Sequence, residues 1–257
     1  MSAAVRKGTA PGPTAVQATT AATAAPTAVP ATVAHRGAPS VVRENTLASF
    51  RAAVAAGADA VELDVRLTRD RVPVVLHDRT LERLWGHETP LSALTYKGLN
   101  SLTDGVPTLA EALAVTHEVR TMIDLPDPAA AAAAVSAVRE ADASARVYYC
   151  GGPDSLRRVR AAEPGAELAL TWHRAAPVRA TLLDDLRPHW LNYRFGLLTP
   201  ALVERAHADG RLVSAWTADR PRTMRRLASM GTDSITTNHI ARLVGVLERA
   251  RRRNPPA

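Results

Sequence analysis

Short apolar runs alternate with amphipathic runs along most of the chain, and this alternation limits the possible folds more than any other sequence feature. Strands are predicted where β-branched and aliphatic residues gather, at residues 32–37, 60–67, 74–77, 121–125, 147–150, 168–172, 190–193, 212–216 and 234–237. Helices are predicted after most of them, at residues 46–56, 109–115, 129–140, 155–162, 178–186, 201–208, 221–230 and 240–252. Strands that alternate with helices are typical of parallel βαβ units.

Eight such units in about 225 residues predict an α/β protein with one closed (β/α)8 (TIM) barrel. Residues 74–77 are interpreted as an extension of the second strand after a turn at Asp70 and Arg71. Residues 79–107 then form an excursion before the next helix. A doubly wound open sheet is the alternative, but no glycine-rich phosphate loop follows the first strand. Helix N-caps are expected at Asn45, Asp154, Thr199 and Asp219.

The two ends of the chain differ in composition from the region between them. Residues 1–31 are rich in Ala, Thr and Pro and contain little that a fold can bury, so this tail is expected to be disordered. The barrel is then assigned to residues 32–250. Residues 251–257 are expected to form a basic C-terminal tail.

The charge and the cysteine content exclude several classes of protein. The formal net charge of +7 suits an anionic substrate or a nucleic acid. No Lys/Arg block with interleaved aromatic residues occurs, which argues against nucleic-acid binding. The single cysteine, Cys150, excludes a disulfide within the chain. No run is as long as the 18 or so apolar residues of a membrane span, and Pro11 and Pro13 stand where a signal peptide has its apolar core, so a cytoplasmic protein is expected.

Two predicted strand ends carry histidine, at the positions where barrels of this kind have their active sites. The first strand ends in His35, Arg36 and Gly37, and the extension of the second strand ends in His77 and Asp78. Two histidines at neighbouring strand ends form a candidate acid/base pair, because the pKa of imidazole lies near neutrality. The adjacent acid is a candidate for orienting the second ring. A structural role in a loop is the alternative for each histidine taken alone.

Carboxylates occupy inward positions on two of the predicted strands. The period of two in a strand places Glu62 and Asp64 on one face and the apolar residues between them on the other, which must lie against the helices. The same parity turns Asp124 inward on the third strand. Unpaired buried carboxylates cost several kcal/mol each, and a divalent cation, Ca²⁺ or Mg²⁺, removes this cost. Salt bridges to inward arginines are the alternative.

Taken in order, these residues resemble the glycerophosphodiester phosphodiesterase family. The matching motifs are His35-Arg36-Gly37, Glu44-Asn45-Thr46, Gly57-Ala58-Asp59, Glu62-Leu63-Asp64-Val65, Thr68-Arg69-Asp70, Val75-Leu76-His77-Asp78 and Trp216-Thr217. The match is dense over residues 33–83 and thin until the last two units. The resemblance implies a (β/α)8 enzyme that hydrolyses glycerophosphodiesters to glycerol phosphate and an alcohol. It also implies a divalent cation held by Glu62 and Asp64, with His35 and His77 as catalytic histidines.

The resemblance further implies residues that contact the substrate. Arg36 is expected to hold the phosphate, since a guanidinium forms two parallel hydrogen bonds with such a group. Trp216 ends the seventh strand, as a tryptophan does in the family, and is included in the substrate site. Glu44 is a further candidate, although beside Asn45 it can also serve the helix N-terminus.

The third strand departs from the family pattern. Family members usually end this strand in Glu-x-Lys, in which the glutamate reaches the metal and the lysine reaches the phosphate. Here the strand ends in Asp124, Leu125 and Pro126, so the acid is shorter and the cation is missing. Arg174 and Arg194, just past the fifth and sixth predicted strands, are predicted to replace that cation.

Two other functions are compatible with the sequence. One is a barrel that binds phosphodiesters without turnover, which the altered third strand favours. The other is a lipid-cleaving phospholipase D, which works at a membrane surface. That activity calls for an exposed apolar lid, for which the excursion offers only Leu84, Trp85 and Leu91.

Two further positions depart from the family pattern. Asn238 stands where the family often has an aspartate. Arg83 is not followed by the two threonines that usually follow an arginine at this place in the family.

Overall fold

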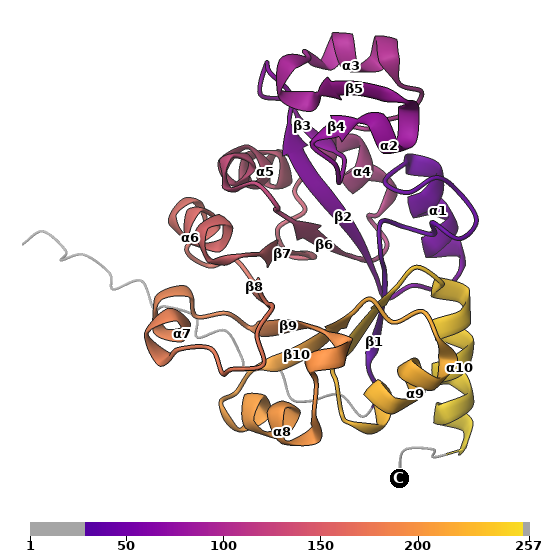
Figure 1. The fold of residues 1–257 in the computed structure, drawn as a ribbon, viewed down its shortest axis with the longest axis vertical. Coiled ribbons are helices and arrows are strands. Elements are labelled where there is room, and N and C mark those ends of the chain that lie inside the picture. The colour runs from indigo at the N-terminus through magenta and orange to yellow at the C-terminus, as the bar shows by residue number, and fades with distance from the viewer. Residues whose placement is uncertain (1–28, 254–257) are drawn as a thin grey trace, which may run out of the picture.

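Parallel strands close into a barrel at the centre of the molecule (Figure 1). The computed structural model describes residues 29–253. The barrel strands, in order around the ring, are β1 (Ala31–Ala34), β2 (Ala60–Leu67), β6 (Arg120–Asp124), β7 (Val147–Gly151), β8 (Leu168–Trp172), β9 (Trp190–Arg194), β10 (Leu212–Trp216) and β11 (Ser234–Thr237). β1 pairs with both β2 and β11, which closes the ring. The predicted (β/α)8 barrel is confirmed, and the open sheet is excluded.

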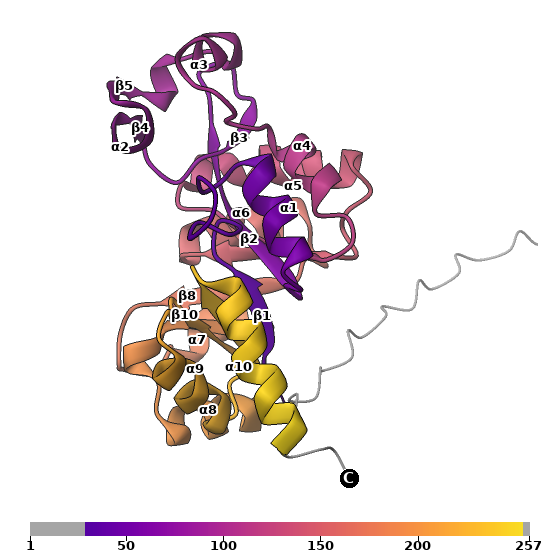
Figure 2. The ribbon, with the colours of Figure 1, turned by 90° about the vertical axis from the view of Figure 1, so that its right-hand side faces the viewer.

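Helices surround the barrel and cover its apolar outer face (Figures 1 and 2). They are α1 (Leu47–Ala55), α4 (Leu109–Val115), α5 (Ala131–Glu140), α6 (Pro153–Ala162), α7 (Ala180–Leu186), α8 (Pro200–Ala208), α9 (Pro221–Ser229) and α10 (Ile240–Arg253), with 3-10 turns η2 (Pro128–Ala130) and η3 (Phe195–Leu197). Val61, Leu63 and Val65 of β2 pack in one core with helix residues such as Phe50 and Leu113. The predicted parity of β2 is therefore confirmed.

The ends of the barrel differ slightly from the predicted bounds. β1 begins at Ala31, whose backbone N–H donates to the carbonyl oxygen of Asp233 at 2.8 Å. α10 continues to Arg253, into the predicted basic tail, because cations are favourable near a helix C-terminus. Of residues 1–31, for which disorder is predicted, residues 1–28 lie outside the described part of the chain. Within residues 29–253, no helix has the length and apolar character needed to cross a membrane.

The chain leaves the barrel between β2 and α4. β3 (Pro73–Val75) follows the predicted turn and pairs antiparallel with the end of β2, so the predicted run 74–77 is a separate strand that ends before His77. Residues 79–107 are named the inserted unit and contain β4 (Thr80–Leu81), α2 (Glu82–Trp85), β5 (His87–Pro90), η1 (Leu91–Ala93) and α3 (Tyr96–Leu102). This unit, at the top of Figures 1 and 2, shares a small core with β3. Leu91 is buried in that core and is not available to an apolar lid. The helices α2 and α3 were not predicted, because they are too short for a helical period to be recognised.

Only one of the four predicted N-caps is in place. The observed caps of the corresponding helices are Thr46, Gly152, Thr199 and Arg220. Thr199 is therefore confirmed, and its hydroxyl accepts a hydrogen bond from the backbone N–H of Leu202. The predictions for Asn45, Asp154 and Asp219 are wrong. Asn45 and Asp219 instead direct their side chains to groups described below.

Candidate active site

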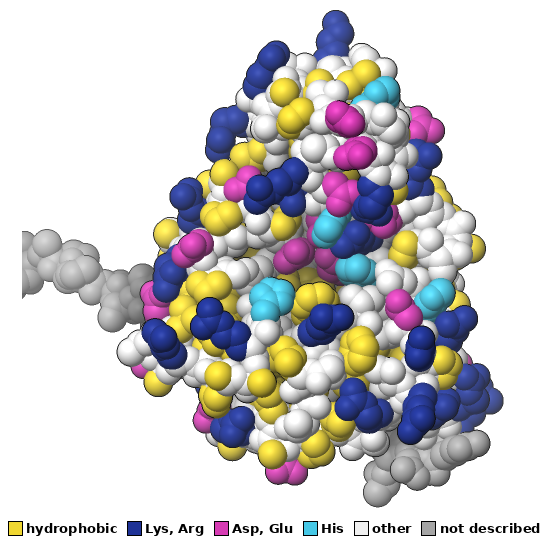
Figure 3. Space-filling model, viewed as in Figure 1, with side chains coloured by type: hydrophobic (Ala, Val, Ile, Leu, Met, Phe, Trp, Pro, Cys, Tyr) yellow, Lys and Arg dark blue, Asp and Glu magenta, His cyan; other side chains and the backbone are white. Residues whose placement is uncertain are grey.

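One cavity of about 440 Å³ lies at the C-terminal ends of the barrel strands. Figure 3 shows histidine, acidic and basic side chains gathered near the middle of this face. Most of the predicted site residues line the cavity: His35, Arg36, Glu62, Asp64, His77, Asp124 and Trp216. Residues from strands far apart in the sequence are thus brought together, as the position of active sites in such barrels predicts.

Three carboxylates form a compact cluster in this cavity. Glu62 and Asp64 alternate on β2, and Asp124 lies beside Asp64 on the neighbouring β6. One carboxylate oxygen from each of the three lies within 4.8 Å of the others. Burial, together with the neighbouring negative charges, raises the pKa of Glu62 well above its usual value and that of Asp124 to about 7. The cluster is therefore unfavourable without a counter-charge.

The cluster fits a divalent cation better than a set of salt bridges. Among residues 29–253, Glu62 and Asp124 form no ion pair with a basic side chain, and only Asp64 has one, to Nε of Arg36 at 3.2 Å. Carboxylate oxygens are the ligands that hard divalent cations prefer. A salt bridge to an inward arginine therefore accounts for Asp64 alone. Within the described part of the chain, Glu62 and Asp124 have no such partner and match a cation site.

Arg36 is held in place by both its backbone and its side chain. Its backbone N–H donates to Oε2 of Glu62 at 2.8 Å, and Nη1 donates to Oε1 of Glu44 at 2.8 Å. The following residue, Gly37, has a φ of +87°, and a Cβ there would lie 2.4 Å from Oγ of Ser49. Only glycine fits this turn, which explains the third residue of the His-Arg-Gly motif.

Asn45 orients one member of the carboxylate cluster. Its side-chain Nδ2 donates to Oδ2 of Asp64 at 2.8 Å, and the side chain is buried. Its backbone has a φ of 54°, a conformation that asparagine tolerates better than most residues. The asparagine of the Glu-Asn-Thr motif therefore serves the site, and the neighbouring Thr46 caps the helix.

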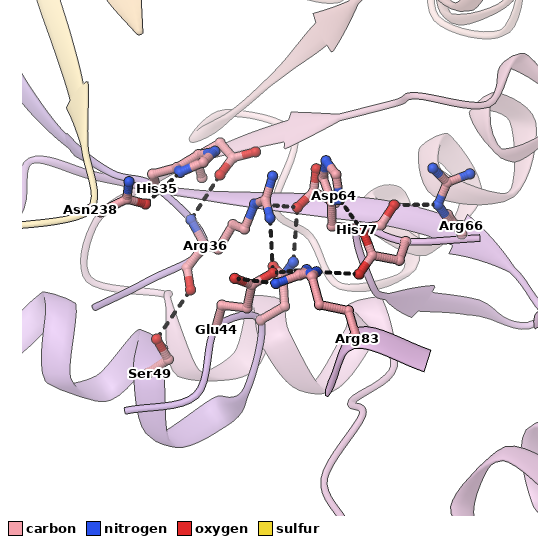
Figure 4. A network of polar contacts seen from close by, with 12 residues as sticks. His35, Arg36, Glu44, Ser49, Asp64, Arg66, His77, Arg83 and Asn238 are labelled. Carbon is pink, nitrogen blue, oxygen red and sulfur yellow. Dashed lines mark hydrogen bonds and ion pairs between the residues drawn. The ribbon is translucent and has the colours of Figure 1, made fainter. Parts of the chain in front are cut away.

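His35 has a neutral partner whose orientation is fixed (Figure 4). Its Nδ1 lies 2.7 Å from Oδ1 of Asn238. Nδ2 of Asn238 in turn donates to Oδ2 of Asp219 at 2.9 Å. Because the amide nitrogen is committed to Asp219, the amide oxygen faces His35 and only accepts. Nδ1 therefore carries the proton and Nε2 has the free lone pair. Burial, followed by the charge of Arg36, lowers the pKa of His35, so the neutral ring is favoured.

His77 has a charged partner. Its Nδ1 lies 2.7 Å from Oδ1 of Asp78, the adjacent residue that was predicted as a candidate for orienting the ring. The other carboxylate oxygen of Asp78 accepts from Nε of Arg83 at 2.6 Å. Although burial acts to raise it, the hydrogen bonds from His77 and Arg83 hold the pKa of Asp78 below its usual range. The carboxylate therefore stays charged and fixes the tautomer of His77.

Three predicted substrate residues do not line the cavity. Glu44 lies between Arg36 and Arg83 and pairs with both. The guanidinium of Arg174 lies over the ring of Trp172, 5.6 Å from its centre. The side chain of Arg194, at the end of β9, is exposed.

The cavity instead contains His173, which was not predicted. Its ring meets the ring of Trp216 edge-on, with centres 5.7 Å apart. The signal for this histidine was its position directly after β8. It was missed because only arginines were considered as replacements for the cation lost at Pro126.

The pKa of Asp124 predicts how pH acts on the stability of the metal-free protein. A carboxyl whose pKa rises from 3.8 in the unfolded chain to about 7 in the folded protein binds its proton more tightly when folded. Its contribution to stability is therefore present below about pH 4 and is lost as the pH rises through about 7. With chelator present, the melting temperature of the wild type should fall relative to Asp124→Asn between these values. A constant difference between the two proteins across that range would contradict this assignment.

A (β/α)8 barrel that places buried carboxylates and two oriented histidines in one cavity is typical of hydrolases that use a divalent cation. The model of the glycerophosphoryl diester phosphodiesterase family matches residues 35–242. The chain is 32% identical over 225 residues to probable glycerophosphodiester phosphodiesterase 2 of Mycobacterium tuberculosis, covering 79% of this chain and 84% of that protein. It is 30% identical over 236 residues to a glycerophosphodiester phosphodiesterase of Caldanaerobacter subterraneus, covering 81% and 93%.

Solved structures of this kind have the same fold. A glycerophosphodiester phosphodiesterase from Parabacteroides distasonis superimposes with a TM-score of 0.75 at 25% identity, over 86% of this chain and 97% of that one. The chain belongs to the glycerophosphoryl diester phosphodiesterase family. It is a phosphoric diester hydrolase that acts on glycerophosphodiesters.

Proposed function

We propose that this enzyme cleaves glycerophosphodiesters to glycerol phosphate and an alcohol with His35 as the proton acceptor and His77 as the proton donor. The observation that carries this assignment is the difference between their partners. His35 is buried against a neutral amide, while His77 faces the carboxylate of Asp78. A neutral imidazole suits the acceptor, and a ring beside a negative charge suits the donor.

Glu62, Asp64 and Asp124 are the residues that would hold a divalent cation, and we propose Ca²⁺ or Mg²⁺ because all three ligands are oxygen atoms. When bound, such a cation supplies positive charge that offsets the negative charge developing on the phosphoryl group. Nε2 of His35 accepts the proton of the attacking group, either water or the glycerol 2-hydroxyl. If the 2-hydroxyl attacks, the product is a cyclic phosphate, which water then opens to glycerol phosphate. His77 delivers a proton to the departing alkoxide. Arg36, held by Glu44, contacts the phosphate.

Hydrolysis of glycerophosphocholine, measured with and without a chelator, tests this function directly. We expect turnover that stops on chelation and returns with added Mg²⁺ or Ca²⁺. Binding without turnover at millimolar metal would favour the barrel that only binds phosphodiesters. Cleavage of phospholipid in vesicles, with no cleavage of glycerophosphocholine, would favour the lipid-cleaving phospholipase D.

We further propose that His173 replaces the phosphate contact that Pro126 no longer provides. His173 lines the cavity and its ring is fixed against Trp216, whereas Arg174 lies over Trp172. His173→Ala should raise KM for glycerophosphocholine about tenfold, the loss of one hydrogen bond to a charged group. Arg174→Ala is the matched control and should leave KM within about twofold. A large rise in KM for Arg174→Ala, with little change for His173→Ala, would instead favour Arg174 as the phosphate contact.

A further inference from the structure

Arg83 connects the inserted unit to two carboxylates of the barrel. It belongs to α2, and its Nε donates to Oδ2 of Asp78 at 2.6 Å. Its two terminal nitrogens donate to the two oxygens of Glu44, at 2.6 Å and 3.2 Å. All three nitrogens of the guanidinium are thus engaged, in the planar fork geometry that matches carboxylates.

Each of these carboxylates also contacts a site residue, and Figure 4 shows Glu44 between Arg36 and Arg83. Asp78 contacts Nδ1 of His77 at 2.7 Å, and Glu44 accepts from Nη1 of Arg36 at 2.8 Å. The side chains of Arg36 and Glu44 are each only 14% exposed, while Arg83 is 46% exposed. Arg83, which is half-exposed, therefore contacts the carboxylate partners of both His77 and Arg36.

We propose that Arg83 is a positioning residue that orients His77 through Asp78 and Arg36 through Glu44. The inference rests on the proposed function of those two residues. A carboxylate with partners on both sides keeps one rotamer, and the group that it contacts keeps one orientation. Exposed ion pairs contribute little to folding stability, so the effect of Arg83 falls on turnover.

The inserted unit is built to hold this guanidinium in place. α2 ends at Trp85, and the φ of 72° at its C-cap Gly86, together with the backbone hydrogen bond from Gly86 to the carbonyl oxygen of Glu82, closes the turn. β4 and β5 on either side of α2 pair with each other, and Leu81 anchors the start of the helix in the small core. A lysine at this position has one point charge on a flexible stem and does not satisfy both carboxylates. Arg83→Lys should therefore recover only part of the function.

The test compares Arg83→Ala and Arg83→Lys with a matched control, Arg43→Ala. Arg43 also links the barrel to the inserted unit, through Asp104 at 2.6 Å and the ring of Trp85, and is 41% exposed, but it contacts no site residue. With glycerophosphocholine and saturating metal, Arg83→Ala should lower kcat about 10- to 100-fold and raise KM severalfold. Arg83→Lys should be intermediate. Arg43→Ala should match the wild type, and the melting temperatures of all variants should stay within a few degrees.

A double-mutant cycle identifies the route through which Arg83 acts. In the Asp78→Asn background the path to His77 is already broken, so adding Arg83→Ala should lower kcat much less than it does in the wild type. The inference is overturned if Arg83→Ala keeps kcat and KM within about twofold of the wild type, if Arg43→Ala loses as much, or if the two changes are independent. Should Arg83→Ala fail to fold, an Arg83→Lys variant with wild-type kinetics overturns it. A wild type that cleaves no glycerophosphodiester contradicts the proposed function itself, and the inference with it.

Discussion

Replacement of either His35 or His77 by alanine is expected to lower kcat for glycerophosphocholine at least about 100-fold, the usual loss when a general acid or base is removed. Both rings line the cavity of the carboxylate cluster, and each has its Nδ1 fixed by a hydrogen-bond partner. Nε2 is then the nitrogen that exchanges a proton. Neither histidine is a cluster residue, so cation binding should survive both substitutions.

Steady-state kinetics, calorimetry with the cation and thermal melting measure these effects together. His117→Ala is the control, because this exposed histidine lies outside the cavity and contacts only neighbouring groups. It should leave kcat unchanged. A near wild-type kcat in His35→Ala or His77→Ala would remove that residue from the mechanism. A loss of cation affinity in either variant would show that the substitution disturbs more than proton transfer.

The double variant Glu62→Gln with Asp124→Asn should lose cation affinity at least about 100-fold, more than is typical when only an outer partner of a metal ligand is removed. Its metal-free form should melt at the same temperature as the wild type or higher. Both carboxylates carry pKa values raised by burial and by neighbouring negative charge, so their ionised forms repel in the absence of a cation. Asp64 keeps its contacts with Arg36 and Asn45 in this variant.

Calorimetry with Mg²⁺ and Ca²⁺, together with melting curves in chelator, checks this expectation. Asp154→Asn is the matched control, because Asp154 lines the same cavity but is 81% exposed and pairs with Arg157. It should bind the cation as the wild type does. An unchanged cation affinity in the double variant would place the metal elsewhere or exclude it.

The parts of the site that lie on strands could be predicted from the sequence. The period of two in a strand is a local property, and it is sufficient to turn Glu62, Asp64 and Asp124 toward the barrel axis. The barrel itself followed from the same kind of local pattern, repeated along the chain. His35 and His77 were placed by the rule that active sites lie at the C-terminal ends of the strands.

The parts that depend on loops could not be predicted in the same way. Asn45 meets Asp64 across 19 residues, and His35 meets Asn238 across 203, so neither contact has a local signal. Beyond the end of a strand the period of two no longer applies, and loop conformation decides where a side chain points. His173 consequently faces the cavity, while Arg174 lies over a neighbouring ring.

The pairing of β1 with β11, which closes the barrel, gives His35 both of its fixed contacts. Its backbone N–H donates to the carbonyl oxygen of Thr237, and its ring meets Asn238, both at the end of β11. The contacts that fix His35, the proposed proton acceptor, therefore form only once β11 has docked against β1. We therefore expect a chain in which β11 has not docked to be inactive, even if Glu62, Asp64 and Asp124 are already in place. The recovery of activity during refolding should then report the closure of the barrel between β1 and β11.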